Sequence, residues 1–347
     1  MSKTIKKCFD EKLTYINLYN AYYRICKCKR NKKYILKYDV DLEIGLNMLL
    51  QELKDNKYKP GNYHEFTIKE PKERLIKALP FRDRIVHQWY IEEFIKPYII
   101  PRFITDSYSC IEGRGSHKGV NILQKYMRSM YLKNNDYYVL KCDISKYFYS
   151  IDRDVLFDIV SKYFSDKKLL NLTKIIIYDN SNGVGIPIGN YTSQYFANIY
   201  LNELDYFVKE DLKVKYYIRY MDDFVMLLDN KNECVRVMRE INDFLNDRLH
   251  LKLNKKSKYF HNKYGINFLG YRIFNDYRLL RKNSIKKIKK NVRIWKKRYK
   301  DDLLKNKEVE LSLNSWYAHI KHCDSYRLKN KINNMVTNIG SSKLSGE

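Results

Sequence analysis

Two adjacent carboxylates, Asp222 and Asp223, lie between two apolar runs, and this pair constrains the fold more than any other feature. Residues 216–220 and 224–228 are rich in aromatic and aliphatic side chains, which is typical of two short strands. The pair is therefore expected at the tip of a tight hairpin. Like charges placed there repel each other and lose solvation, so packing alone does not explain them. A divalent ion such as Mg²⁺, which prefers hard oxygen ligands, would stabilise both; an exposed Asp-Asp turn is the alternative.

A third carboxylate follows another strand-like run. Residues 138–142 are typical of a buried strand, and Asp143 comes at its end. An acid at that position can meet the hairpin tip that carries Asp222 and Asp223. Three carboxylates from two elements can hold two divalent ions about 4 Å apart, and the backbone carbonyl of Ile144 could add a ligand. That geometry activates a 3′-hydroxyl and stabilises a departing pyrophosphate, which predicts nucleotidyl transfer.

Three other segments are candidates for nucleotide binding. Phe148 would lie beside the sugar of an incoming nucleotide and exclude a 2′-hydroxyl by bulk, although an ordinary core aromatic fits the same position. Residues 63–80 alternate in places and carry four cations, which suits a triphosphate or a template backbone; a solvated strand face is the alternative. A Gly- and Pro-rich loop over 183–194 leads into an apolar helix over 195–207, with Thr192 or Ser193 as its N-cap.

The charge balance points to a polyanionic partner. The chain has 67 Lys and Arg against 40 Asp and Glu, a formal net charge of +27, and nucleic acid is the simplest ligand for that excess. Between Arg281 and Glu308, thirteen Lys or Arg stand against three acids. Ile285, Ile288, Val292 and Trp295 fall on one face of the same segment. We expect a basic helix with an apolar back that lies along a duplex.

Several protein classes are disfavoured. No apolar run approaches the roughly 18 residues that span a membrane, and the N-terminus lacks the apolar core of a signal peptide. The 7 cysteines are scattered without zinc-ligand spacing. We therefore expect a cytoplasmic protein with reduced thiols, bacterial or phage-encoded, that has no membrane partner.

Four motifs in order relate the chain to a known family: Asp143, the loop Ile186-Pro-Ile-Gly189, Tyr220-Met-Asp-Asp223 and Phe268-Leu-Gly-Tyr271. With them the chain resembles the reverse transcriptases, from about Tyr38 to about Leu328. The resemblance implies an α+β, right-hand polymerase fold of fingers, palm and thumb, with an antiparallel palm sheet and a helical thumb.

The same resemblance implies approximate domain boundaries. The N-terminal extension and fingers are expected over 1–135, the palm over 136–275 with a fingers-contributing segment near 160–190, and the basic helical thumb with a short tail over 276–347.

The resemblance also assigns roles, residue by residue. The metal ligands are Asp143, Asp222 and Asp223, with Ile144, and they hold two Mg²⁺ ions for which Mn²⁺ can substitute. The nucleotide-binding residues are Lys69, Arg74, Ile144, Phe148, Ile188, Gly189 and Gln194, with Phe148 as the sugar gate. Phe268, Leu269, Gly270 and Tyr271 form the primer grip. Lys256 resembles the palm lysine that protonates pyrophosphate, although Lys255 and Lys258 compete for that role.

Within that family the likeness is to the reverse transcriptases of bacterial diversity-generating retroelements. It rests on residues 71–87, 188–194, 196–202 and 315–322. Many other reverse transcriptases have Gln at position 188, whereas this chain has Ile. The likeness implies a template RNA copied from dNTPs into cDNA with frequent errors at adenines, an RNA–DNA duplex product, a dedicated structured RNA and a small basic accessory protein.

Alternatives remain at this point. Some defence-associated or abortive-infection reverse transcriptases share the variation in the loop over 188–194. A catalytically inactive nucleic-acid-binding scaffold would also account for the net positive charge. A group II intron protein is disfavoured, because the sequence after the basic helix leaves no room for a maturase extension or an endonuclease. No RNase H domain is visible.

Overall fold

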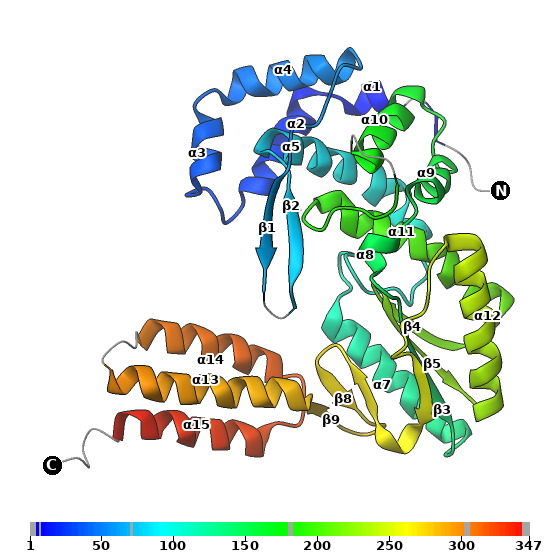
Figure 1. Ribbon diagram of the computed structural model, residues 1–347, viewed down its shortest axis with the longest axis vertical. Helices are drawn as coiled ribbons and strands as arrows, with labels where there is room; N and C mark the ends of the chain where they lie inside the picture. The colour runs from blue at the N-terminus through cyan, green and yellow to red at the C-terminus, as the bar shows by residue number, and fades with distance from the viewer. Residues whose placement is uncertain (1–4, 7, 70–71, 180–182, 302–305, 342–347) are drawn as a thin grey trace. The chain divides into compact units, whose positions relative to one another are not determined.

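The computed structural model of the protein describes residues 5–6, 8–69, 72–179, 183–301 and 306–341 (Figure 1). Helices account for most of these residues, and the strands form three small sheets. The expected α+β class is therefore confirmed.

The α-helices of the described residues are α1 (Phe9–Lys12), α2 (Tyr15–Cys26), α3 (Lys33–Asp39), α4 (Leu42–Lys54), α5 (Phe81–Tyr90), α6 (Lys96–Tyr98), α7 (Ser116–Lys133), α8 (Tyr147–Ser150), α9 (Arg153–Ser161), α10 (Lys167–Tyr178), α11 (Tyr191–Tyr206), α12 (Lys231–Leu249), α13 (Lys282–Lys300), α14 (Asn306–Ile320) and α15 (Tyr326–Ser341). Shorter helical turns are η1 (Ile91–Ile95), η2 (Ile100–Arg102), η3 (Phe207–Asp211) and η4 (Asn262–Tyr264).

The strands are β1 (His64–Ile68), β2 (Arg74–Ala78), β3 (Tyr138–Asp143), β4 (Tyr216–Tyr220), β5 (Asp223–Leu228), β6 (Lys258–His261), β7 (Ile266–Phe268), β8 (Tyr271–Ile273) and β9 (Arg278–Leu280). β1 and β2 form an antiparallel hairpin in which Ile68 pairs with Arg74. The second sheet has the order β4-β5-β3-β6, and the third has the order β7-β8-β9 with antiparallel pairing.

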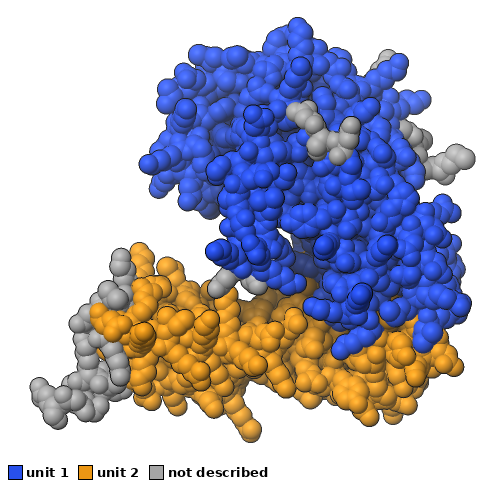
Figure 2. Space-filling view, viewed as in Figure 1, with its two compact units in different colours: residues 1–114, 141–225, 235–258 blue, residues 115–140, 226–234, 259–347 orange. Residues whose placement is uncertain are grey.

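The chain divides into two compact units, which are coloured separately in Figure 2. Unit 1 consists of Met1–Arg114, Lys141–Val225 and Val235–Lys258; unit 2 consists of Gly115–Leu140, Met226–Cys234 and Tyr259–Glu347. The boundaries of fingers, palm and thumb stay a prediction.

The N-terminal helices of unit 1 pack through residues at helical spacing. Leu18, Tyr22 and Cys26 are all buried on one face of α2, which packs against α4 and α5. In α5, Trp89 is fully buried and its ring meets Phe94 edge to face, with centroids 5.2 Å apart. Unit 1 therefore has an aromatic core of its own.

Helix α11 lies at the centre of unit 1 and is buried along most of its length. It begins at Tyr191, four residues earlier than the sequence pattern indicates, with Asn190 as N-cap residue. The predicted N-cap at Thr192 or Ser193 is therefore wrong. The reason is tertiary: the Thr192 hydroxyl lies 2.8 Å from Nδ1 of His87, so it is used by a buried contact.

Unit 2 ends in three helices, α13, α14 and α15. Ile288, Val292 and Trp295 of α13 are buried against Ile332 and Ile339 of α15, which confirms the apolar face of the basic helix. Ile285, the fourth residue predicted for that face, is half-buried near the beginning of the helix. No helix in the described ranges combines the length and apolar character needed to cross a bilayer.

Candidate active site

The Asp222–Asp223 hairpin has the predicted form. β4 ends at Tyr220, β5 begins at Asp223, and Met221 and Asp222 form the turn. Met221 has φ 58°, a left-handed conformation that is uncommon for a residue with a side chain. A positive φ at the first turn residue is the pattern of a type II′ hairpin. Strained turns of this kind persist where the surrounding structure holds them.

Arg219 provides that support. Its side chain is completely buried, and its Nε donates to Oδ1 of Asp205 at 2.7 Å while a second donor contacts Oδ2. A third donor, Nη1, reaches the carbonyl oxygen of Met221 at 3.0 Å. Tyr217 donates to the same Asp205 carboxylate at 2.7 Å. The buried Arg219–Asp205 ion pair thus fixes the turn through the hydrogen bond from Arg219 to Met221. Sequence reasoning missed this ion pair.

Asp143 is held by a segment more than a hundred residues away in the chain. Nδ2 of Asn254 donates to Oδ2 of Asp143 at 3.0 Å, and the backbone N–H of Asn254 donates to the Asp143 carbonyl at 2.8 Å. The backbone N–H of Asp143 donates to Oγ of Ser257 at 3.1 Å. These contacts fix the carboxylate orientation at the end of β3.

The three carboxylates lie close enough to affect each other's ionisation. Burial, and then the charges of Asp222 and Asp223, raise the pKa of Asp143 to about 6, although Lys141 and Lys72 oppose the shift. Burial and the charge of Asp223 also raise the pKa of Asp222. Deprotonating all of them is therefore unfavourable without a nearby cation.

The donor chemistry of this group fits a hard divalent ion, since the groups are carboxylate oxygens whose negative charges are incompletely neutralised. Lys141 contacts the Asp223 carboxylate and acts as a partial counter-charge. Within the described part of the chain, no three His, Cys, Asp or Glu side chains converge as a ready-made metal centre.

Cations of the β1–β2 hairpin act on the same group. Arg74 and Lys72 both lower the pKa of Asp222 through their charges, so they lie within electrostatic range of the carboxylates. Arg74 begins β2 and is exposed. Lys69, directly after β1, is also exposed, but it is not among the charges that act on Asp222. The structure thus brings Arg74 into electrostatic reach of the site, together with Lys72, and gives no such link for Lys69.

The loop at Ile188 and Gly189 packs against β2. The backbone N–H of Lys77 donates to the Ile188 carbonyl at 2.9 Å. Gly189 has φ 137°, and a Cβ there would lie 2.4 Å from the Lys77 carbonyl oxygen, so only glycine fits. Gln194 is exposed, and its Oε1 accepts a hydrogen bond from Sγ of Cys110 at 3.3 Å.

Phe148 lies in the short helix α8 and is half-buried. Its carbonyl oxygen accepts from the backbone N–H of Ile186 at 2.8 Å, which joins this residue to the loop that carries Ile188. Ile144 is buried next to Asp143, and it pairs with Leu253 through an isolated bridge.

Lys256 is exposed in the turn that follows Asn254. Its backbone N–H donates to Oδ1 of Asn254 at 3.0 Å, and Asn254 in turn contacts Asp143. The predicted lysine therefore belongs to the segment that holds a candidate metal ligand, and its proton-donor role stays a prediction.

The predicted primer-grip residues belong to unit 2. Phe268 ends β7, Tyr271 begins β8, and the two residues pair across a turn formed by Leu269 and Gly270. Both turn residues have positive φ, 46° and 93°, as a type I′ hairpin requires. Tyr271 donates its hydroxyl hydrogen to the His319 carbonyl at 2.8 Å. Sequence reasoning missed that α14 supports this hairpin.

A family comparison matches residues 59–273, more than half of the chain, to Reverse transcriptase (RNA-dependent DNA polymerase). The chain belongs to the reverse transcriptase family. Enzymes of this family generally use divalent metal ions.

Two curated proteins are similar to the chain. Protein YkfC of Escherichia coli is 26% identical over 277 residues, which cover 67% of this chain and 72% of that protein. The putative COX1/OXI3 intron 2 protein of Saccharomyces cerevisiae is 23% identical over 197 residues, which cover 38% of this chain and 23% of that protein. The chain therefore spans less than a quarter of the yeast relative.

Two solved telomerase structures are also similar. Apo telomerase from Candida tropicalis, truncated from its C-terminal domain, has a TM-score of 0.48 at 13% identity over 63% of this chain and 55% of that chain. Telomerase from Candida albicans with a TWJ fragment of telomeric RNA has a TM-score of 0.48 at 13% identity over 70% and 52%. The chain spans about half of each.

Proposed function

We propose that this protein is an RNA-directed DNA polymerase that copies a template RNA into cDNA by nucleotidyl transfer from dNTPs. One observation carries the proposal. In a chain of the reverse transcriptase family, the charges of Asp222 and Asp223 raise the pKa of Asp143, so the three carboxylates lie close together. The positive charges of Lys72 and Arg74 lower the pKa of Asp222, so these cations lie within reach of the same carboxylates. Metal-bound phosphate fits between such carboxylates and such cations.

Two Mg²⁺ ions bound here, or Mn²⁺ in their place, would supply the positive charge that favours ionisation of the primer 3′-hydroxyl and offsets the charge of the departing pyrophosphate. Asp143, Asp222 and Asp223 would hold them, with the Ile144 carbonyl nearby. The residues of the chain do the remaining work. Arg74 and Lys69 pair with the triphosphate, the loop with Ile188, Gly189 and Gln194 lies over the nascent base pair, and Phe148 packs against the sugar.

The two remaining roles concern the primer and the leaving group. The hairpin formed by Phe268, Leu269, Gly270 and Tyr271 supports the primer end, and Lys256 donates the proton that pyrophosphate takes up. The product is an RNA–DNA duplex.

Primer extension tests the polymerase activity. The full chain is given an RNA template, an annealed DNA primer, dNTPs and Mg²⁺. Asp222→Asn should lose about 10³-fold or more in rate, because a lost metal ligand removes several kcal/mol of transition-state stabilisation. Asp158→Asn, a change at an exposed position of α9, is the matched control and should extend like the wild type. Equal rates for Asp222→Asn and the control would contradict the proposal.

Within this activity, we propose that the protein serves a diversity-generating retroelement and makes frequent errors at template adenines. The support is the sequence likeness of the loop and of residues 71–87. An aliphatic Ile188 cannot hydrogen-bond the incoming nucleotide, and the lost bond costs about 1–2 kcal/mol of discrimination. Ile188→Gln should therefore lower misincorporation opposite adenine in primer extension. An unchanged error spectrum would count against this link.

This role implies a dedicated structured RNA, a small basic accessory protein and a cytoplasmic location in a bacterial or phage-infected cell. The neighbouring genes distinguish it from the alternatives. Near-identical repeats that differ at adenines support the retroelement. Defence genes support an abortive-infection role, and an intron around the gene supports an intron-encoded protein, a role that the name of the yeast relative suggests.

A further inference from the structure

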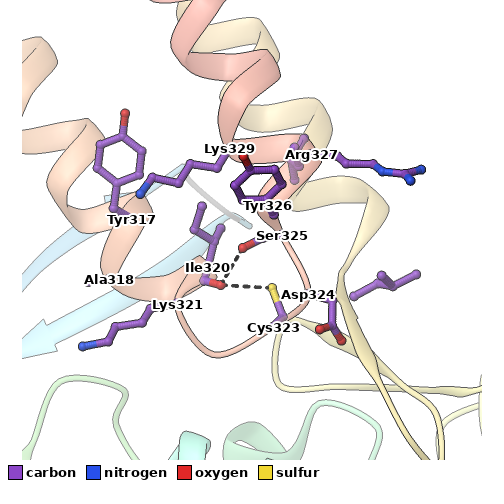
Figure 3. Close-up of a pocket in the computed structure, with 12 residues that line it drawn as sticks. Tyr317, Ala318, Ile320, Lys321, Cys323, Asp324, Ser325, Tyr326, Arg327 and Lys329 are labelled. Atoms are coloured by element: carbon purple, nitrogen blue, oxygen red, sulfur yellow. Dashed lines mark hydrogen bonds between the residues drawn. The ribbon is translucent and has the colours of Figure 1, made fainter.

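Unit 2 contains a cavity of about 1010 Å³ between the end of α14, the beginning of α15 and β9 (Figure 3). Its lining is largely apolar and aromatic. Leu279 of β9 and Ile320 of α14 contribute aliphatic surface, and Tyr317 and Tyr326 contribute rings. Tyr326 is 79% exposed, so its ring is free to stack on a flat ligand.

Cations line the same cavity. Lys321, Arg327 and Lys329 contribute three positive charges, whereas Asp324 is the acid among the described lining residues. Nζ of Lys329 lies 5.4 Å from the centroid of the Tyr317 ring, so an aromatic surface and a positive charge occur side by side. Oδ2 of Asp324 accepts a hydrogen bond from the backbone N–H of Arg278 at 3.0 Å, which holds this carboxylate at the beginning of β9.

The cavity continues into two smaller hollows. Lys321, Cys323 and Asp324 also line a hollow of about 380 Å³, to which Arg128 and Arg278 add positive charge and Asp276 a negative charge. That hollow in turn shares residues with a third one of about 270 Å³. The three hollows adjoin through these shared residues, and together they are called the track. An extended series of hollows suits a linear ligand better than a compact small molecule.

Aromatic rings interleaved with cations along a track are the features that bind single-stranded nucleic acid, since every base presents a π-face and every nucleotide carries a phosphate. A small basic protein would be repelled by the same charges. In the proposed reaction the growing cDNA is paired with its template, so RNA outside the copied stretch is the available single strand.

We propose that this track binds single-stranded RNA, with bases stacked on Tyr326 and Tyr317 and phosphates beside Lys329 and Arg327. The site is additional to the one that holds the primer–template duplex. The inference rests on the proposed function only for the choice of RNA over single-stranded DNA as the natural ligand.

Fluorescence anisotropy of a labelled, unstructured single-stranded RNA tests the track on the full chain, with preannealed primer–template present in excess. Tyr326→Ala should weaken RNA binding about tenfold without changing its salt dependence, and Tyr326→Phe should bind normally. Lys329→Ala should lower the slope of log K against log salt by about 0.7, the value for one lost phosphate contact. Lys331→Ala, on the same helix but outside the lining, should leave the slope unchanged.

Wild-type affinity and slope in both Tyr326→Ala and Lys329→Ala would overturn the proposal. A second readout is independent of variants: bound RNA should slow maleimide labelling of Cys323, which lines the track, but not of the exposed Cys28 in unit 1. Equal labelling of Cys323 with and without RNA would also overturn it.

Two control measurements separate this idea from the polymerase proposal. Primer extension on the preannealed duplex should be unchanged in both variants. If the variants change RNA binding as expected but the wild type does not extend a primer, the polymerase proposal is refuted and the proposal of RNA binding by the track stands. Tighter binding of single-stranded DNA than of RNA would overturn the choice of RNA.

Discussion

Replacing Asp143 by Asn should stabilise the metal-free protein while abolishing polymerase activity. Burial and two neighbouring carboxylates raise the pKa of Asp143 from 3.8 to about 6. The folded state therefore binds this proton more tightly than the unfolded state does. The resulting stability is present in acid, falls as pH rises from about 4 to about 6, and is fully lost above that.

Raising the pKa from 3.8 to about 6 corresponds to about 3 kcal/mol. Because Asp143 is half-exposed, solvent screening reduces this to about 1–2 kcal/mol. Asn has the same shape and keeps the hydrogen bond from Asn254. Asp143→Asn should therefore raise the free energy of unfolding by about 1–2 kcal/mol near neutral pH, and by nothing below pH about 4.

Urea unfolding in EDTA, followed by tryptophan fluorescence, to which the buried Trp89 of unit 1 contributes, measures this difference. Asp158→Asn serves as the control and should change nothing. Added Mg²⁺ should stabilise the wild type more than Asp143→Asn, because only the wild type has the full ligand set. A metal-free Asp143→Asn protein as stable as the wild type at neutral pH, or less stable, would refute the argument from charge repulsion.

Three other variants test the surroundings of the site. Asp205→Ala should lower the free energy of unfolding by about 3–5 kcal/mol, because the buried Arg219 then loses its carboxylate partner. Urea unfolding measures this loss, and a value under about 1 kcal/mol would contradict the prediction. Burial lowers the pKa of His87 from 6.5 to about 3. Between pH 6.5 and pH 3, His87 is therefore protonated in the unfolded state but not in the folded state, and the free energy of unfolding falls as the pH falls through that range. His87→Gln should remove about 2 kcal/mol of the fall in the free energy of unfolding between neutral pH and about pH 5. Urea unfolding at several pH values measures it, and the same fall in the variant as in the wild type would count against this account. Gly189→Ala should cost about 1–3 kcal/mol and slow primer extension, because its Cβ meets the Lys77 carbonyl; wild-type stability would show that the loop moves freely.

Local patterns were sufficient to predict the carboxylate hairpin. The apolar runs around Asp222 and the strand before Asp143 are short-range signals, and all three strands form where they were expected. The apolar face of α13 was predictable for the same reason, since its period of 3.6 residues is visible in the sequence.

Long-range contacts were not predictable. Asn254 reaches Asp143, and Lys141 contacts Asp223, through side chains that carry no local pattern. Arg219 left a weak signal, because an arginine within a buried strand requires a partner, but nothing identified that partner as Asp205. The start of α11 was missed for a similar reason.

The most direct test of the central claim is incorporation of a single dNTP onto a DNA primer annealed to RNA, with and without Mg²⁺. The account predicts Mg²⁺-dependent incorporation by the wild type and a loss of about 10³-fold or more in Asp222→Asn. Equal incorporation by the two proteins, or incorporation by the wild type without any divalent ion, would contradict it.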